Sequence, residues 1–546
     1  MQTTSKPSRT WLKYEALIPI VLFLSFIFIT LPGISWGAPD LWHPDEILKE
    51  ALQALEGDYQ FDEENFDYPS LPKYVLYGMG KAVYSLGYSK ADLIRSARGF
   101  SVILGGLTVA LTYGITRLAG GGVPAAMLGS LLVASSSEMA LNARFAHNDP
   151  YLAFFSLLTV AALLQYQRQK GKGWLYLSFL TVGLAASSKY NGASLLLAPL
   201  VVYLLTKRSA VFEKPLESFE TLFVGLGLSG LGYALGTPKA LLWMAYYIKR
   251  AAPAILRHAS YAREPGSLIG LLGQWKVLSQ TLGFGVFLLL IGALLWHAAR
   301  LIQSAWRSKG QSGSTLEPIA VLMLAILALD LPILVSYNYQ PRFFLPLIPL
   351  LASLAGLFTE ELYRSVVTSR RKLLALLIVA GVVALITFSF LRVLHVALLF
   401  RHDARIPASE YLKSLPVGAT IEYTLYPPSL PEGHFSRKHN YPIFFKKFPG
   451  QELPTSRLYQ FNQGEAGLEE RQTDYLVIDS FTYERFEDEF ICASHQVECD
   501  FFNRLRAGKT RYRLLRSFHY ETPTWLPDLR LPFVNPDIEV YQRIAP

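Results

Sequence analysis

The sequence contains few charged residues and very few cysteines. Charged side chains make up 17% of its 546 residues, whereas hydrophobic residues make up 51%. An average soluble domain carries about 25% charged residues, so this composition excludes an ordinary soluble enzyme and predicts a polytopic membrane protein. Two cysteines, Cys492 and Cys499, are too few for a disulfide framework, and they lack partners at zinc-ligand spacing. A single local disulfide between them is left open.

Three further absences narrow the function. The chain has no glycine-rich phosphate loop of the kind that binds nucleotides. It has no evident cleavable signal peptide, because its first apolar run is too long and lacks a small-residue cleavage site. The formal net charge of +9 is not gathered on a polar face but lies between apolar runs, so no nucleic-acid partner is expected.

Long apolar runs dominate the first 400 residues and predict about eleven transmembrane helices. The runs lie at 15–36, 95–116, 121–138, 150–166, 174–189, 191–206, 219–236, 277–297, 317–336, 343–359 and 373–394. Lysine and arginine are denser in the connections that face the cytoplasm if the N-terminus is cytoplasmic. The sequence therefore predicts a multi-pass protein of the plasma (inner) membrane, with a cytoplasmic N-terminus and an extracytoplasmic C-terminal part.

The hydrophobic pattern of the chain changes near residue 400, after which no apolar run is long enough to span a membrane. "DYLVIDS", "YRLLRSFHY" and "IEVYQRI" are typical of strands, and the acidic stretch "TYERFEDEF" favours a helix. We predict an all-α polytopic membrane domain at 1–400 and a soluble, extracytoplasmic α/β domain at 401–546. In the first external loop, "HPDEILKEALQALEG" predicts an amphipathic juxtamembrane helix that ends at Gly57.

The most distinctive polar residues all fall at predicted external ends of spans, which is typical of a functional site. They are Asp45, Glu46, His147, Asp149, Lys189 and Arg342. Each also has a plainer interpretation, and these alternatives stay open. Asp45 and Glu46 suit the start of a helix, and Asp149 suits an N-cap. Arg342 suits an aromatic interfacial belt, and Lys189 suits a side chain that reaches water from a helix end.

A basic segment lies in the predicted external loop at 237–276. Lys249, Arg250, Arg257 and Arg263 recur there at roughly helical spacing. Two interpretations are open: an amphipathic helix on the membrane surface that meets anionic headgroups, or a set of cations that binds a substrate phosphate.

Several segments occur in an order that resembles one membrane-enzyme family. They are "HPDE", "YPSLPKYVLY", "RSARGFSVILGGLTVALTYGITRLAGG", "ARFAHNDPYLAFFSLLTVAALL", "GLAASSKYNGASLLLAPLVVYLL" and "QPRFFLPLIPLLASLAG". Over about residues 10–400 the chain resembles the GT-C membrane glycosyltransferases of the protein O-mannosyltransferase and aminoarabinose-transferase type, which use dolichyl- or undecaprenyl-phosphate sugars. The resemblance implies that Asp45 is the catalytic carboxylate, with Glu46 beside it and Asp149 lining the site. "YPSL" stands where lipid A-modifying relatives carry "KPPL", and no lumenal domain between spans is apparent, so the acceptor stays undecided.

The expected function is inverting transfer of a sugar from a polyprenyl-phosphate donor to a lipid, glycan or protein hydroxyl. Asp45 would accept the hydroxyl proton, with Glu46 and Asp149 as the other catalytic carboxylates. Arg342 and Lys189 would hold the departing phosphate. The other expected substrate-binding residues are His147, Tyr68, Tyr339 and Arg263. No cofactor is assigned, and a divalent cation is left open because ligand spacing alone does not define a site. The alternative function is a transporter or flippase of a lipid-linked or anionic solute, for which ionisable groups near the bilayer midplane would be expected.

Overall fold

The computed structural model describes residues 15–57, 65–207, 213–259, 270–307, 316–335, 339–440 and 464–544. The chain divides into two units. The first comprises Met1–Ile34 and Asp45–Leu394, and the second comprises Ser35–Pro44 and His395–Pro546.

The described part of the first unit is built from helices. They are α2 (Leu17–Thr30), α3 (Leu48–Glu56), α4 (Leu71–Ser85), α5 (Lys90–Leu118), α6 (Val123–Ala134), α7 (Ser137–Asn142), α8 (Asp149–Gln169), α9 (Lys172–Ser188), η1 (Tyr190–Leu196), α10 (Leu197–Thr206), α12 (Pro215–Gly236), α13 (Lys239–Leu242), α14 (Met244–Ala259), α15 (Gly270–Leu282), α16 (Phe284–Arg307), α17 (Pro318–Leu334), η2 (Pro341–Phe344), α18 (Ile348–Thr368) and α19 (Lys372–Arg401).

A helix overlaps each of the eleven apolar runs of the sequence. The run at 277–297 is divided between α15 and α16, because Gly283 separates them with a φ of +83°. By length and apolar composition, four helical stretches of the described residues can each cross a bilayer alone: Lys90–Leu118, Pro215–Gly236, Phe284–Arg307 and Lys372–Leu412. The membrane character of the first unit is thus supported, whereas the number of spans stays a prediction.

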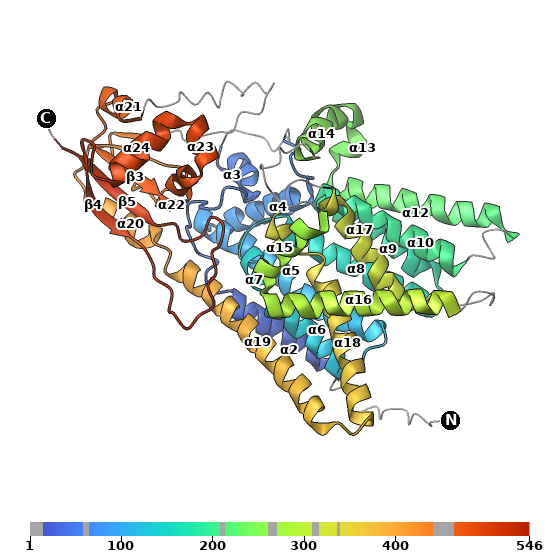
Figure 1. The fold of residues 1–546 in the computed structure, drawn as a ribbon. Helices are drawn as coiled ribbons and strands as arrows, with labels where there is room; N and C mark the ends of the chain where they lie inside the picture. The colour runs from blue at the N-terminus through green and yellow to red at the C-terminus, as the bar shows by residue number, and fades with distance from the viewer. Residues whose placement is uncertain are drawn as a thin grey trace. The chain divides into compact units, whose positions relative to one another are not determined.

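Close helix packing in the first unit depends on small residues. In Figure 1 α9 and α12 run side by side, and they meet through Gly183 and Gly232. A Cβ on Gly183 would lie 2.1 Å from the carbonyl oxygen of Ser229, and one on Gly232 would lie 2.2 Å from that of Leu180. Only glycine permits this approach, as is common between membrane helices. The packing fixes the end of α9, where Lys189 follows.

Helix α5 carries a charged residue into the interior. It begins with a capping box, in which the Ser89 hydroxyl accepts from the Asp92 amide while the Asp92 carboxylate accepts from the Ser89 amide. Two turns further along, Arg98 is completely buried. A buried guanidinium needs acceptors within reach, and these include the Glu46 carboxylate just before α3 and the Ile34 carbonyl after α2.

The second unit contains a mixed sheet with short helices. Its elements are α20 (Arg405–Leu412), β1 (Thr420–Tyr423), β2 (Arg437–Asn440), α21 (Gly464–Glu470), β3 (Tyr475–Asp479), α22 (Ser480–Tyr483), η4 (Glu484–Glu487), α23 (Glu489–Ser494), α24 (Gln496–Arg506), β4 (Tyr512–Phe518) and β5 (Ile538–Arg543). The strand order is β2-β1-β3-β5-β4. β1 is parallel to β2 and β3, and β5 is antiparallel to β3 and β4. β3 is buried along its whole length, as expected for the apolar central strand of a covered sheet.

Strands β3, β4 and β5 coincide with the three strand segments expected from the sequence. β1 and β2 were not expected, because each has only four residues; β1 (TIEY) mixes polar with apolar side chains, and β2 (RKHN) contains no apolar residue. "TYERFEDEF" is helical but divided among α22, η4 and α23.

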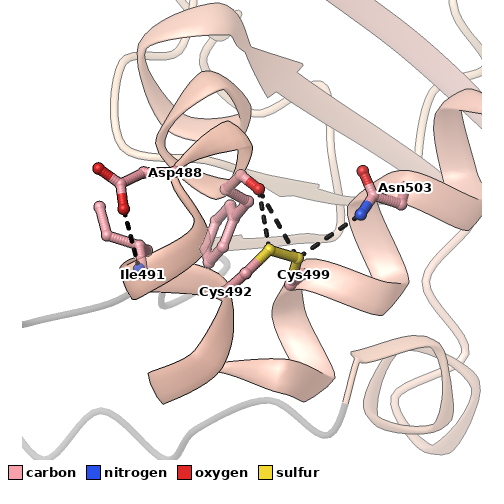
Figure 2. The surroundings of a disulfide bond; sticks show 6 residues. Asp488, Ile491, Cys492, Cys499 and Asn503 are labelled. Atoms are coloured by element: carbon pink, nitrogen blue, oxygen red, sulfur yellow. Dashed lines mark hydrogen bonds between the residues drawn. A yellow bond between two sulfur atoms is a disulfide. The ribbon is translucent and has the colours of Figure 1, made fainter.

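The two cysteines of the chain form a disulfide in the second unit. Cys492 lies in α23 and Cys499 lies in α24, with their Cα atoms 5.3 Å apart. Figure 2 shows the bond between the two helices, with the Asn503 amide nitrogen 3.5 Å from the Cys499 sulfur. The local disulfide that the sequence left open is therefore present.

Candidate active site

Five ionisable side chains from different segments of the first unit form one continuous network. Asp45 Oδ2 accepts a hydrogen bond of 2.9 Å from Arg342 Nη1. The same nitrogen of Arg342 lies 3.2 Å from His147 Nε2. On its other side, His147 Nδ1 lies 2.6 Å from Asp149 Oδ2, and Asp149 Oδ1 accepts from Lys189 Nζ at 2.6 Å. Sequence analysis placed these five residues at one end of the spans, and the structure brings them into contact.

Backbone geometry explains how Lys189 reaches Asp149. α9 ends at Ser188, and Lys189 adopts an extended conformation (φ −155°, ψ 136°) before η1 begins. Gly192 lets η1 fold back against α9, because a Cβ there would lie 2.5 Å from the carbonyl oxygen of Ala185. The lysine is therefore held at the end of the bundle, where α8 also begins.

Asp45 and Glu46 lie just before α3 and face different surroundings. Glu46 is buried, and its two oxygens accept from Arg98 Nε and Nη2 at 2.8 Å each. Glu46 Oε1 also accepts from the backbone amide of Ala146, and the amide of Ile47 donates to the Ala146 carbonyl. Glu46 and Arg98 thus fasten the first external segment to the segment that precedes His147.

This geometry distinguishes the three carboxylates. The helix α3 begins after Asp45 and Glu46, so neither residue serves as its first turn. The side chain of Asp45 is 34% exposed, whereas Glu46 and Asp149 have no exposed side-chain surface. Glu46 is paired with Arg98, and Asp149 is paired with Lys189.

The protonation state of His147 follows from its surroundings. Burial lowers the pKa of His147, and the neighbouring Asp149 carboxylate only partly opposes this shift. The imidazole is therefore neutral at ordinary pH. Since Arg342 can only donate, Nε2 of His147 accepts and Nδ1 carries the proton toward Asp149. His147 therefore lies between Asp149 and Arg342 and contacts both.

The two cations of the network, Arg342 and Lys189, have different surroundings. Burial alone would lower the pKa of Arg342, but the charges of Asp149, Tyr68 and Asp45 raise it above its ordinary value. Within the described residues, the Arg342 Nε atom is buried without a hydrogen-bond partner. Lys189 Nζ lies 4.6 Å from the ring centre of Phe343. A ligand with several acceptor oxygens would satisfy the Arg342 donor that the protein leaves unused.

The structure describes two of the three remaining residues that the sequence assigned to the site. The Tyr68 ring packs edge-on against His147, with ring centres 6.1 Å apart, and therefore lies at the network. The Tyr339 hydroxyl accepts from the Gly270 amide and fixes the start of α15. Arg263 lies outside the described residues.

Two buried residues of this region were missed by the sequence analysis. Arg98 could have been noticed as an arginine within a 29-residue apolar helix, where ionisable groups are functional candidates. Glu138 lies on the short helix α7, and its Oε1 accepts from Asn142 Nδ2 at 2.6 Å. Among the described residues, no cluster of three or more histidine, cysteine, aspartate or glutamate side chains could hold a metal ion.

Comparisons with known proteins bear on the fold of the chain and on its general class. Residues 83–223 match the family model for dolichyl-phosphate-mannose-protein mannosyltransferases. An alignment over 400 residues, which covers 68% of this chain, matches it to undecaprenyl phosphate-alpha-4-amino-4-deoxy-L-arabinose arabinosyl transferase 1 from Pseudomonas fluorescens. The two sequences are 26% identical over this alignment. The match spans 65% of the length of that relative.

Solved structures share the fold over most of the chain. ArnT from Cupriavidus metallidurans in the apo state aligns with a TM-score of 0.51 at 17% identity, over 86% of this chain and 94% of ArnT. The oligosaccharyltransferase AglB from Archaeoglobus fulgidus aligns with a TM-score of 0.52 at 13% identity, over 96% of this chain and 76% of AglB. Together, these similarities support a membrane glycosyltransferase with a GT-C fold.

The family match and the site overlap only in part. The matched range 83–223 includes His147, Asp149 and Lys189, together with the helices α5, α8 and α9 that carry or support them. Asp45 and Arg342 lie outside it, and their membership of the site rests on the hydrogen bond between them.

Proposed function

We propose that this chain transfers a sugar from a polyprenyl-phosphate donor to an acceptor hydroxyl, with inversion at the anomeric carbon. The observation that carries the proposal is the network from Asp45 through Arg342 and His147 to Asp149 and Lys189. It sets one accessible carboxylate beside an arginine with an unused buried donor. The name of the Pseudomonas relative and the dolichol-phosphate bound to AglB support a polyprenyl-phosphate donor.

In the proposed reaction the donor phosphate takes hydrogen bonds from Arg342, and Lys189 supplies the second positive charge. This competes with the Asp45–Arg342 contact and releases the Asp45 carboxylate for the acceptor. The acceptor oxygen then bonds to the anomeric carbon while the bond from that carbon to the phosphate oxygen breaks. Asp45 takes the hydroxyl proton, and polyprenyl phosphate leaves with the bonding electrons.

The different exposures of the carboxylates support a mechanism in which the acceptor attacks the anomeric carbon directly, in a single displacement. A retaining route requires a carboxylate nucleophile that attacks the sugar before the acceptor does. Asp149 has no exposed side-chain surface and lies between His147 and Lys189. Asp45 alone then serves as base, and one direct attack inverts the configuration.

The decisive experiment uses purified protein, a polyprenyl-phosphate sugar and a set of glycolipid, glycan and peptide acceptors. The wild-type protein is expected to release polyprenyl phosphate and glycosylate one acceptor class. Asp45→Asn is expected to reduce turnover by about 10²–10⁴, the usual contribution of general-base catalysis. Asp40→Asn is the matched control, because Asp40 is an exposed aspartate five residues upstream.

The outcomes separate the two candidate functions. Full turnover by Asp45→Asn contradicts the role of that residue. Movement of a lipid-linked sugar across vesicles without release of polyprenyl phosphate would instead indicate a flippase. Repeating the assay with a chelator and with added Mg²⁺ or Mn²⁺ shows whether a divalent cation takes part.

We also propose that the site faces the extracytoplasmic side. The disulfide of the second unit supports this placement, since such bonds persist in oxidising compartments. A cysteine introduced at Asp40 is expected to react with a membrane-impermeant maleimide on intact cells. Labelling only after the membrane is opened would reverse the topology.

A further inference from the structure

Helix α14 presents two different exposed faces. Its inner face consists of Tyr247, Ala251 and Ala254, which are buried and recur at spacings of four and three residues. An adjacent stripe is apolar and exposed, and the cations Lys249 and Arg250 lie beyond it. The exposed apolar residues are Met244, Ile248, Ile255 and Leu256. A helix with this pattern is typical of the boundary between headgroups and acyl chains.

The inner face attaches α14 firmly to the bundle. The Tyr247 and Tyr233 hydroxyl groups are hydrogen-bonded, and the Tyr247 ring packs edge-on against Phe66 at 5.0 Å between ring centres. Because one face is occupied in this way, the exposed apolar stripe keeps a fixed direction relative to α12.

The exposed stripe continues an apolar surface that begins on α12. Leu235, near the end of α12, is 63% exposed, and it is followed by Leu242 at 72% and Trp243 at 57%. α12 is one of the helices long and apolar enough to cross a bilayer. Figure 1 shows α13 and α14 at the end of α12. Exposed apolar residues that follow one another along the chain from a helix able to span a bilayer onto α14 point to lipid as their cover.

Cations and aromatic rings border this surface. Lys239 Nζ lies 5.3 Å from the Trp243 ring centre and 5.4 Å from that of Tyr246. The Arg250 guanidinium lies 5.7 Å from the Tyr246 ring centre. Tryptophan and tyrosine favour the headgroup level, and lysine and arginine there attract anionic lipids.

The surface lies at the same end of the bundle as the active site. Thr237, just before α13, accepts from the Ser70 amide and shares a hydrogen bond with Ser187, two residues before Lys189. Two segments that frame the site are therefore tied to the start of α13.

We propose that α13 and α14 form a docking surface for anionic phospholipids of the leaflet at the active-site end. The stripe of Met244, Ile248, Ile255 and Leu256 enters the acyl boundary, and Lys249 and Arg250 bind the lipid phosphates. The surface anchors α14 at the membrane level from which a lipid-linked substrate reaches the site.

The first test measures depth with a spin label at Ile248→Cys in nanodiscs. The natural cysteines do not react, because they are joined in a disulfide. Val417→Cys, on an exposed residue of the second unit, is the control. The label at position 248 is expected to favour collisions with oxygen, whereas the label at 417 should favour a water-soluble relaxation agent. Equal, water-like behaviour at both positions overturns the proposal, as does protection of position 248 from both agents in detergent, which would indicate a second copy.

The second test measures binding of phosphatidylglycerol to the full-length protein by native mass spectrometry and by lipid competition. The double variant Lys249→Gln/Arg250→Gln is expected to lose about fivefold in apparent affinity for each cation removed at low salt. Lys509→Gln/Arg513→Gln, an exposed pair in the second unit, should leave it unchanged. Weaker binding of polyprenyl phosphate with unchanged binding of phosphatidylglycerol would overturn the proposal and assign the cations to the donor.

Discussion

The buried pair of Glu46 and Arg98 permits a quantitative test of how the site is held together. Neither side chain is exposed, and two hydrogen bonds of 2.8 Å join them. Glu46→Gln leaves the guanidinium charge of Arg98 buried without its counter-charge. Breaking such a pair from one side costs about 3–5 kcal/mol, so both Glu46→Gln and Arg98→Met are expected to destabilise the first unit by that amount.

The double variant distinguishes this account from simple loss of packing. If the single variants suffer mainly from an unpaired buried charge, Glu46→Gln/Arg98→Met removes that charge and costs clearly less than the sum of the two. The measurement is thermal unfolding of the four proteins in one detergent, together with turnover at a temperature where all are folded. Turnover is expected to fall even in the double variant, because residue 46 loses the two hydrogen bonds from Arg98 that hold it against the segment before His147.

Additive losses of stability would contradict the buried-charge explanation. Unchanged turnover in the double variant would show that the connection between the two external segments does not position the site. Lys413→Gln/Glu410→Gln is a suitable control, because that ion pair is exposed and is expected to contribute at most about 1 kcal/mol.

Three further expectations follow from the structure. Arg342→Lys should raise the KM for the polyprenyl-phosphate donor about tenfold or more in steady-state assays, because lysine cannot replace the planar donor fork; an unchanged donor KM would place the phosphate elsewhere. Replacing Cys492 and Cys499 by serine should destabilise the second unit by about 2–3 kcal/mol, the cost of opening a loop this short, as measured by denaturant unfolding. Glu138 is buried and its Oε1 accepts from Asn142 Nδ2, so Glu138→Ala should destabilise the first unit by about 1–3 kcal/mol in thermal unfolding, and unchanged unfolding would contradict this contact.

Sequence patterns located the helices and the polar residues that the structure joins in one network. Apolar runs of about twenty residues suffice to place helices of this kind, because a chain in lipid must satisfy its backbone polar groups within each segment. Polar residues at the ends of those runs were also visible, which is why His147, Asp149 and Lys189 were found from the chain alone. The short strands β1 and β2 were missed, because their pairing with β3 and with each other depends on neighbours far along the chain.

Equal carboxylates in the sequence became unequal in the structure. Asp45, Glu46 and Asp149 share one chemistry, and in the sequence only the family resemblance singled out Asp45. Arg98 lies 52 residues after Glu46, and Lys189 lies 40 residues after Asp149. Packing of α5 and α9 brings each cation to its carboxylate and excludes water from the pair, and Asp45 keeps an exposed surface.

The sequence by itself predicted a membrane protein, polar groups at one end of its helices, and a resemblance to the GT-C glycosyltransferases. Those features depend on local composition and on the order of short motifs, which need no knowledge of packing. Only the tertiary structure decided which carboxylate stays accessible, which cation keeps a donor for a phosphate, and which face of α14 remains uncovered. Burial and ion pairing depend on residues that are distant in the chain. The exposure of each side chain and its partner are therefore set only when the helices have packed.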